Sequence, residues 1–340
     1  MSLPPQDLVT DIRGADIQLQ RRAMAKAITL LESSRADHRS AADDMLTQLL
    51  PYTGHSLRIG LSGVPGVGKS TLIEALGLWL IKQGHKVAVL AIDPSSSVSG
   101  GSILGDKTRM ELLSVHPSAF IRPSPSSGTL GGVAEKTREC MLVCEAAGYD
   151  IVMVETVGVG QSETAVAGMT DMFVLMQLPN AGDDLQAIKK GVMELADLVL
   201  INKADLDPEA ASRAQAFIRS AMQLLRGGHG HHSDKQPAHW MPDVLNSSAL
   251  QGVGVKEFWA QVLSFKQLQM ADGQWVSRRQ TQSLSWMNDR IAAGLKQAFQ
   301  SNTEVSQMLP ALKADVLAGK VAASTAARQL LAAWNTSANQ

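Results

Sequence analysis

The sequence predicts a three-layer α/β domain built on a mostly parallel β-sheet, with helical extensions before and after it. Between residues 57 and 248, short and continuously apolar segments alternate with segments of helical periodicity. Continuous apolar runs are typical of strands that are buried on both faces of a parallel sheet. Strands that alternate with helices indicate crossover connections, which place helices on both faces of the sheet. With 45% apolar residues, the 340-residue chain can bury a large core.

The helical extensions differ in pattern from the central part of the chain. Leu19, Ala23 and Ala27 recur at helical spacing, so we expect this apolar stripe to pack on the domain that follows. The last part of the chain is helical again and contains large aromatic residues, which favours a packing surface, and we expect it to pair two copies of the chain. The division that we expect is an N-terminal helical extension (1–54), the α/β domain (55–265) and a C-terminal helical dimerisation arm (266–340).

Six segments have the length and composition of strands in the central domain. Each is short, rich in Val, Ile, Leu or Met, and bounded by turn or helix signals. They are residues 57–62, 86–93, 150–155, 171–178, 197–202 and 243–248.

Composition and charge exclude several classes of protein. The formal net charge is −1, so electrostatics favour neither a nucleic-acid partner nor an anionic membrane. No apolar run approaches the roughly 18 residues of a membrane-spanning helix. The first 14 residues mix Asp7, Asp11 and Arg13 without an apolar core, which does not match a secretory or mitochondrial targeting segment. We therefore expect a cytoplasmic protein.

The cysteine content fits a reducing compartment. Cys140 and Cys144 are the two cysteines of the sequence, and their spacing of four places them on one face of a predicted helix. Two cysteines are too few for a disulfide framework. We interpret them as small buried apolar residues rather than as a redox pair.

A glycine-rich phosphate-binding loop follows the first predicted strand. The segment from Gly63 to Ser70, GVPGVGKS, matches G-x-x-x-x-G-K-[ST] and opens a predicted helix, which is the context that the motif requires. Gly66 and Gly68 allow successive N–H groups to converge on a phosphate, Lys69 supplies a charge to the β and γ oxygens, and Ser70 is a ligand for Mg²⁺. The remaining nucleotide-binding positions of this segment are Val64, Pro65, Val67 and Thr71.

A second motif indicates which base is bound. Asn202, Lys203 and Asp205 form N-K-x-D at the end of a predicted strand. An ionised Asp accepts the two hydrogen bonds that guanine N1–H and N2–H₂ donate, whereas adenine would leave this carboxylate unpaired at a cost of about 1–3 kcal/mol. The motif therefore predicts specificity for GTP. After the next strand, backbone groups of Ser248, Ala249 and Leu250 are placed to close over the base.

Glu155 ends another predicted strand and is followed by Gly158, in the place where most GTPases carry D-x-x-G. A carboxylate here holds the Mg²⁺ shell, and the amide of Gly158 can meet the γ-phosphate. Val159 stands where Ras-like proteins place their water-orienting Gln, and Gln161 lies two residues further on. We therefore expect slow intrinsic hydrolysis that a partner accelerates.

Further candidate groups follow the second predicted strand. Asp93 ends that strand and faces the ligand crevice, although an Asp before Pro is also a common turn residue. The glycine-rich segment 100–110 then carries Asp106, Lys107 and Arg109 towards the nucleotide.

These segments together resemble the MeaB/ArgK/MMAA family of P-loop GTPases. The resemblance covers roughly residues 20–300 and is carried by GVPGVGKST, AIDPSSSVSGGSILGDKTRM, FIRPSPSSGTLGG, VETVGVGQSE, LPNAGDDLQAIKKG and NKAD. It implies a GTPase that chaperones an adenosylcobalamin-dependent acyl-CoA mutase, usually methylmalonyl-CoA mutase, and that gates cofactor loading and exchange. It also implies a homodimer formed through the C-terminal arm.

The resemblance also implies roles for individual residues. The metal and hydrolysis residues would be Lys69, Ser70, Asp93, Asp106 and Glu155, with GTP or GDP and Mg²⁺ as cofactors. Arg109 would lie in the first switch, and the segment from Gly158 to Glu163, with Gln161, in the second. Asp183, Gln186 and Lys189 would form a third, client-responsive switch, in which Lys189 assists hydrolysis; by itself this segment is typical of a solvated loop. We expect no tightly bound cobalamin on this chain, since it lacks D-x-H-x-x-G.

Two alternative functions stay open at this stage. His229, His231, His232 and His239 form a glycine-rich cluster that departs from the family pattern and would suit a nickel- or zinc-delivering metallochaperone GTPase. A kinase is the other alternative, but N-K-x-D favours GTP, and no second substrate site can be recognised. The client mutase is not specified by the sequence, since methylmalonyl-, isobutyryl-, ethylmalonyl- and 2-hydroxyisobutyryl-CoA mutases would all serve.

Overall fold

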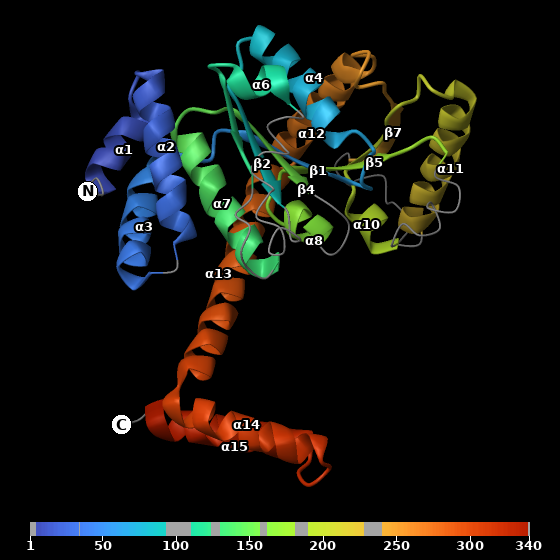
Figure 1. Cartoon of the computed structure of the whole chain (residues 1–340). Coiled ribbons are helices and arrows are strands. Elements are labelled where there is room, and N and C mark those ends of the chain that lie inside the picture. Colours follow the sequence, from blue (N-terminus) through green and yellow to red (C-terminus); the bar gives the residue numbers. More distant parts are fainter. Residues whose placement is uncertain are drawn as a thin grey trace. The chain divides into compact units, whose positions relative to one another are not determined.

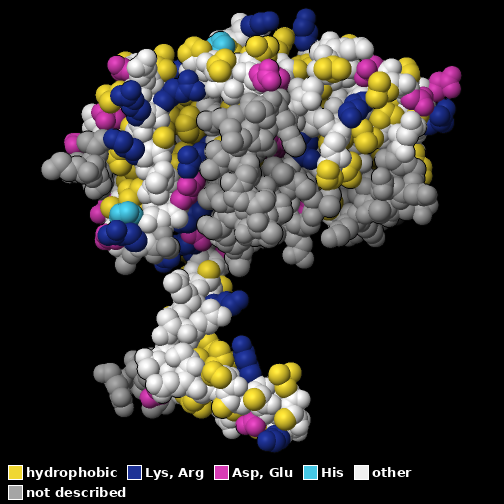
Figure 2. All heavy atoms as spheres, in the orientation of Figure 1, with side chains coloured by type: hydrophobic (Ala, Val, Ile, Leu, Met, Phe, Trp, Pro, Cys, Tyr) yellow, Lys and Arg dark blue, Asp and Glu magenta, His cyan; other side chains and the backbone are white. Residues whose placement is uncertain are grey.

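The computed structural model describes residues 5–33, 35–92, 110–123, 130–156, 162–180, 190–227 and 240–338. The chain divides into two compact units, Met1–Arg279 and Gln280–Gln340. The predicted three-part division stays a prediction. Among the described residues on the face shown in Figure 2, acidic and basic side chains are interspersed, in keeping with the net charge of −1.

The first unit is built on a parallel sheet with the strand order β3-β2-β4-β1-β5-β6-β7 (Figure 1). Its strands are β1 (Leu57–Gly63), β2 (Val87–Ile92), β3 (Ala119–Arg122), β4 (Ile151–Thr156), β5 (Met172–Gln177), β6 (Leu198–Ile201) and β7 (Asp243–Asn246). The six predicted strands are confirmed within one or two residues at most ends. The sequence analysis missed β3, which lies within a stretch rich in Pro and Ser, HPSAFIRPSPSS, that reads as a loop. The predicted three-layer α/β fold is confirmed.

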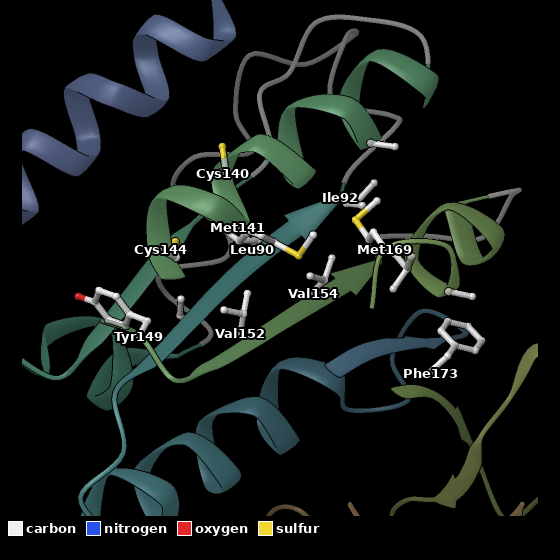
Figure 3. Packing of buried hydrophobic residues seen from close by; sticks show 14 of the residues in the cluster. Leu90, Ile92, Cys140, Met141, Cys144, Tyr149, Val152, Val154, Met169 and Phe173 are labelled. Carbon is white, nitrogen blue, oxygen red and sulfur yellow. The ribbon is translucent and has the colours of Figure 1, made fainter. Parts of the chain in front are cut away.

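Helices cover both faces of the sheet because successive strand residues point to opposite sides. In β4, Val152 and Val154 join one core cluster, whereas Ile151 and Met153 join the other. The helices of the first face are α7 (Leu130–Ala146), α8 (Ser162–Ala167), α10 (Lys190–Leu195) and α11 (Pro208–Gly227). The helices of the second face are α4 (Lys69–Lys82), α6 (Glu111–Val115) and α12 (Val255–Ala271). Figure 3 shows the first face, where Met141 of α7 packs on Leu90 and Val154.

The N-terminal helices α1 (Pro5–Arg13), α2 (Ile17–Glu32) and α3 (Ala36–Leu49) extend the first core cluster rather than forming a separate one. Ala23 and Ala27 of the predicted stripe are buried in this cluster, together with residues of α7. Gln20 of α2 connects α1 to the chain after α7, because its Nε2 donates to the carbonyls of Ile12 (2.8 Å) and Ala147 (3.1 Å). The prediction that the stripe packs on the following domain is confirmed for Ala23 and Ala27 and is wrong for Leu19, which is 46% exposed.

The two cysteines lie side by side on α7, and both are free and buried. Burial raises the pKa of both thiols well above the usual range, so neither forms the thiolate that redox chemistry needs. The interpretation of Cys140 and Cys144 as buried apolar residues is confirmed.

At the amino edge of the sheet, an aspartate before β5 binds the start of helix α13 (Gln274–Ser301). Asp171 Oδ2 accepts the backbone N–H of Arg58 at 2.8 Å. The same carboxylate pairs with Arg279, whose Nε and Nη2 donate to Oδ1 and Oδ2 at 2.7 and 2.6 Å. Asp171 is 2% exposed, so this buried charge depends on Arg279 for its partner.

A second aspartate repeats this arrangement one strand further along. Asp197 Oδ2 accepts the backbone N–H of Phe173 at 2.8 Å. Arg278 donates to both carboxylate oxygens of Asp197, at 3.2 and 2.9 Å. Arg278 and Arg279, which are consecutive in α13, therefore bind the aspartates that precede two neighbouring strands of the first unit, β6 and β5.

The second unit contains the rest of α13 and the helices α14 (Thr303–Leu317) and α15 (Ala323–Ala338), which pack side by side (Figure 1). Val305, Ala326 and Leu330 are buried between them. The rings of Phe299 and Trp334 meet edge to face, 5.9 Å apart. No helix in the described parts of the chain is long and apolar enough to cross a membrane.

Candidate functional site

The candidate site lies along the carboxyl edge of the sheet. Because the strands are parallel, the ends of β1, β4, β5 and β6 lie at this edge, with β1 between β4 and β5. Ligands of open α/β sheets bind at this edge.

The loop between β1 and α4 has the backbone conformation of a phosphate cradle. Gly66 and Gly68 have φ angles of 79° and 99°, a region that residues with a side chain rarely adopt. Gly68 also has no room for a Cβ, which would lie 2.4 Å from Asn202 Nδ2. The helix α4 starts directly after Gly68 and is held in the core by Leu72 and Leu76. The loop therefore places the amino end of α4 at the carboxyl edge of the sheet, where its partial positive charge favours a bound anion.

Lys69 lies inside this loop. Its Nζ donates to the carbonyl of Gly63 at 2.7 Å and to that of Val64 at 3.3 Å. The side chain is 9% exposed, so its charge is held close to the loop backbone.

Ser70 and Glu155 face each other across the site. Ser70 Oγ lies 3.5 Å from Glu155 Oε2, and Glu155, the penultimate residue of β4, is 2% exposed. A hydroxyl beside a buried carboxylate is a donor set that suits Mg²⁺, which binds through one or two protein oxygens. These two residues fit the predicted metal site.

Asn202 connects the phosphate loop to the second predicted motif. Its Nδ2 donates to the carbonyl of Val67 at 2.8 Å. Its Oδ1 accepts the backbone N–H of Ala249 at 3.0 Å and the hydroxyl of Ser247 at 3.3 Å. Lys203 follows with a positive φ of 61°, which turns the chain sharply at this point. One buried amide therefore holds together three segments that are distant in sequence.

Asp205 lies at the end of this turn and has a partner that the sequence analysis did not identify. Gln251 Nε2 donates to Asp205 Oδ2 at 3.2 Å. Gln251 directly follows Ser248, Ala249 and Leu250, and this position beside the predicted base loop is the signal that could have found it.

Ser248, Ala249 and Leu250 form a tight turn. Ser248 and Val253 exchange two backbone hydrogen bonds of 3.0 Å, and Ala249 is buried beside Asn202. Leu250 is 85% exposed, so its side chain does not contribute to the core. The turn precedes Gln251, which contacts Asp205, and its role at the base stays a prediction.

The remaining predicted residues lie outside the described parts of the chain. This applies to the hydrolysis and switch residues Asp93, Asp106, Arg109, Gly158, Gln161, Asp183, Gln186 and Lys189. It also applies to the histidine cluster at 229–239. Among the residues that are described, no group of three or more His, Cys, Asp or Glu side chains could hold a metal ion.

The chain is similar to characterised and solved proteins over most of its length. Residues 24–304 match the family model of the methylmalonyl-CoA mutase-associated GTPase MeaB. GTPase ArgK of Escherichia coli is 50% identical over 271 residues, which are 79% of this chain and 80% of that protein. The mouse mitochondrial methylmalonic aciduria type A homolog is 44% identical over 328 residues, which are 93% of this chain and 77% of that protein.

A solved structure gives the same result for the fold. The crystal structure of an LAO/AO transport system kinase superposes with a TM-score of 0.74 at 37% identity, covering 96% of both chains. The phosphate loop, the N-K-x-D turn and these similarities agree. The chain therefore belongs to the MeaB family of methylmalonyl-CoA mutase-associated GTPases and is a P-loop GTPase.

Proposed function

We propose that this GTPase is the G-protein chaperone of an adenosylcobalamin-dependent acyl-CoA mutase of the methylmalonyl-CoA mutase type. In this role it gates the loading and exchange of adenosylcobalamin and protects the mutase. The observation that carries the proposal is the family match across residues 24–304, which includes both nucleotide motifs. The name of the mouse relative supports the link to methylmalonate metabolism. We further propose that the protein acts in the cytoplasm.

Two groups of residues would hold the nucleotide, one at the phosphate end of the site and one at the base end. Backbone N–H groups of the loop from Gly63 to Thr71 and the ammonium of Lys69 bind the phosphates, because they form a concave, positively polarised surface. Asp205 accepts hydrogen bonds from guanine, and backbone groups of the turn at 248–250 close over the base. Asn202 keeps these two ends at a fixed separation.

Mg²⁺ would be held by Ser70 and Glu155, with Asp93 and Asp106 as further carboxylates. When bound, this ion neutralises charge that develops on the transferring phosphoryl group. The residues of the chain orient the phosphates: Lys69 approaches from the loop, and the buried Glu155 keeps the Ser70 hydroxyl aligned. The positions proposed to respond to the client are Arg109, Gln161, Asp183, Gln186 and Lys189, with Lys189 assisting hydrolysis.

We propose that the C-terminal helices pair two copies of the chain. Leu284, Met287, Ile291 and Leu295 are each more than half exposed and recur at helical spacing along α13. Such a stripe is more apolar than a surface helix needs, and a second copy would bury it. Sedimentation equilibrium tests this, with Leu284→Asp and Ile291→Asp together expected to give a monomer.

The experiment that tests the function measures GTP hydrolysis by the purified protein, alone and with an adenosylcobalamin-dependent acyl-CoA mutase of the same organism. We expect slow turnover that the mutase accelerates, with ATP not hydrolysed. Lys69→Ala is the inactive control. Asp205→Asn is the matched control for base choice. The side-chain amide of Asn can donate to the C2 carbonyl of xanthine, so this variant should no longer bind GTP and should bind xanthosine triphosphate instead.

Acceleration of GTP turnover by methylmalonyl-CoA mutase would support the client assignment, and acceleration by another acyl-CoA mutase would redirect it. If no acyl-CoA mutase changes the rate, the chaperone proposal is wrong, while GTPase activity stands independently.

A further inference from the structure

The short helix α6 begins without a cap of its own. Met110, the residue before it, makes no side-chain hydrogen bond to the helix. The acceptor comes instead from α4, where Glu74 Oε1 accepts the backbone N–H of Leu112 at 2.9 Å and that of Leu113 at 3.4 Å. A carboxylate in this place pairs amides that the helix cannot pair within itself, and its charge suits the amino end of a helix. The cap of α6 is therefore supplied by a different helix.

Apolar packing holds α6 against the same helix. The two helices are in contact, and Figure 1 shows α6 beside α4. Leu113 is fully buried and lies directly on Gly77, where an added Cβ would be 2.8 and 2.9 Å from the two Cδ atoms of Leu113. Met110 is fully buried in the second core cluster. The start of α6 therefore has two kinds of attachment to α4, a polar one through Glu74 and an apolar one at Gly77.

This attachment lies between two parts of the predicted metal site. On α4, Glu74 follows Ser70 by one helical turn, about 6 Å along the axis. On the other side, Met110 lies four residues after Asp106. Four residues span at most about 14 Å, whereas the fourteen residues between the end of β2 and Asp106 can span about 50 Å. The anchored start of α6, and not the end of β2, therefore limits how far Asp106 can lie from Ser70.

We propose that Glu74 is a positioning residue for Mg²⁺-dependent GTP hydrolysis. By capping α6 it keeps the segment that carries Asp106 within reach of a metal ion at Ser70. Glu74 acts through the backbone of α6 and is not itself a metal ligand. The proposal rests on the metal role proposed above for Ser70 and Asp106, and it is independent of the identity of the client mutase.

The test compares Glu74→Ala with Glu74→Gln. The amide oxygen of Gln can accept the same two N–H groups, whereas Ala removes the acceptor. We expect Glu74→Ala to lower kcat for GTP about fivefold, the worth of a helix cap, and to raise the half-saturating Mg²⁺ concentration by a similar factor. The KM for GTP should change less than about twofold. Glu74→Gln should stay within about twofold of the wild type in all three values. A loss in Glu74→Gln equal to that in Glu74→Ala would overturn the proposal, because it would assign the effect to the negative charge.

Two further measurements do not depend on turnover. The first follows the release of a fluorescent, non-hydrolysable GTP analogue. Glu74→Ala should need about fivefold more Mg²⁺ to slow release, with release in EDTA unchanged. The second is hydrogen exchange at the amides of Leu112 and Leu113, which should be faster in Glu74→Ala than in the wild type. Unchanged exchange would mean that packing alone holds α6, and the proposal would be wrong.

Glu111→Ala is the matched control. It removes an exposed acidic side chain from the first turn of α6 and leaves both hydrogen bonds of Glu74 in place. It should behave as the wild type in every measurement, and an effect equal to that of Glu74→Ala would contradict a role through the cap. The Mg²⁺ dependence of the wild type is measured first. Its absence would overturn the metal site together with the role of Glu74, whereas a dependence that Glu74→Ala leaves unchanged would overturn the role of Glu74 alone.

Discussion

The side-chain amide of Asn202 donates a 2.8 Å hydrogen bond to the backbone carbonyl of Val67, although 135 residues separate them in the sequence. The other end of the same amide accepts the N–H of Ala249. The phosphate loop and the base turn are therefore joined by one buried side chain, which is 2% exposed. Such a residue affects binding by holding two recognition elements together, without needing to touch the nucleotide.

Asn202→Ala should weaken GDP and GTP equally. The change removes the hydrogen bonds of Asn202 to Val67, Ala249 and Ser247 and leaves buried backbone groups unpaired, which costs about 1–3 kcal/mol. Isothermal calorimetry should show dissociation constants at least tenfold higher for both nucleotides. Unchanged constants would show that the two loops are held in place by other contacts.

Gly68→Ala and Gly66→Ala separate backbone strain from a steric clash. Both glycines have positive φ angles, so both variants should lose about 1 kcal/mol of unfolding free energy. A Cβ at Gly68 would also meet Asn202 Nδ2, whereas a Cβ at Gly66 has no atom within 4 Å. We therefore expect Gly68→Ala to abolish nucleotide binding and Gly66→Ala to weaken it less. Equal binding by the two variants would contradict the importance of the Asn202 contact.

Gln251→Ala should tighten nucleotide binding. Gln251 donates to Asp205 Oδ2, the carboxylate that we expect guanine to use, so it competes with the base. Removing an exposed hydrogen bond to a carboxylate should lower the dissociation constant of GDP about two- to fivefold. Stopped-flow measurement of association should locate the gain in the on-rate. A weaker complex would instead mean that Gln251 contacts the bound base.

The buried pair of Arg279 and Asp171 should be important for stability. Arg279→Leu leaves an aspartate that is 2% exposed without its counter-charge, and should cost about 3–5 kcal/mol in urea unfolding. Arg279→Leu combined with Asp171→Asn should cost less than the sum of the two single changes. Arg35→Leu, which breaks an exposed pair with Asp37, is the control and should change nothing measurable.

Stability should fall as acid protonates Glu145. Burial by itself raises the pKa of this carboxyl, but hydrogen bonds and charge from Arg58, with Ser56 and Gly54, outweigh it and lower the pKa below its usual value. A lowered pKa means that the stabilisation is present above the unfolded pKa and is lost as the pH falls through the folded value. Glu145→Gln should flatten the unfolding free energy between about pH 5 and pH 3. An unchanged slope would assign acid sensitivity to other groups.

The sequence could predict the features that are encoded by residues close together in the chain. The phosphate loop and N-K-x-D are short contiguous motifs, and the buried strands show as apolar runs, so both could be located before the structure. The strand β3 was missed because it lies within a stretch rich in Pro and Ser, which locally resembles a loop. The contacts of Asn202 with Val67, and of Gln251 with Asp205, depend on how distant segments are brought together, which no local pattern encodes.

The pairing of Arg278 and Arg279 with Asp197 and Asp171 has a practical consequence for dissecting the protein. The nucleotide-binding part cannot be shortened at the predicted border of residue 265 without removing both arginines and leaving two largely buried aspartates uncompensated. A fragment that ends after Arg279 keeps these pairs intact. Experiments that remove the C-terminal helices, or graft the nucleotide-binding part onto another polypeptide, should therefore place the junction beyond the second turn of α13.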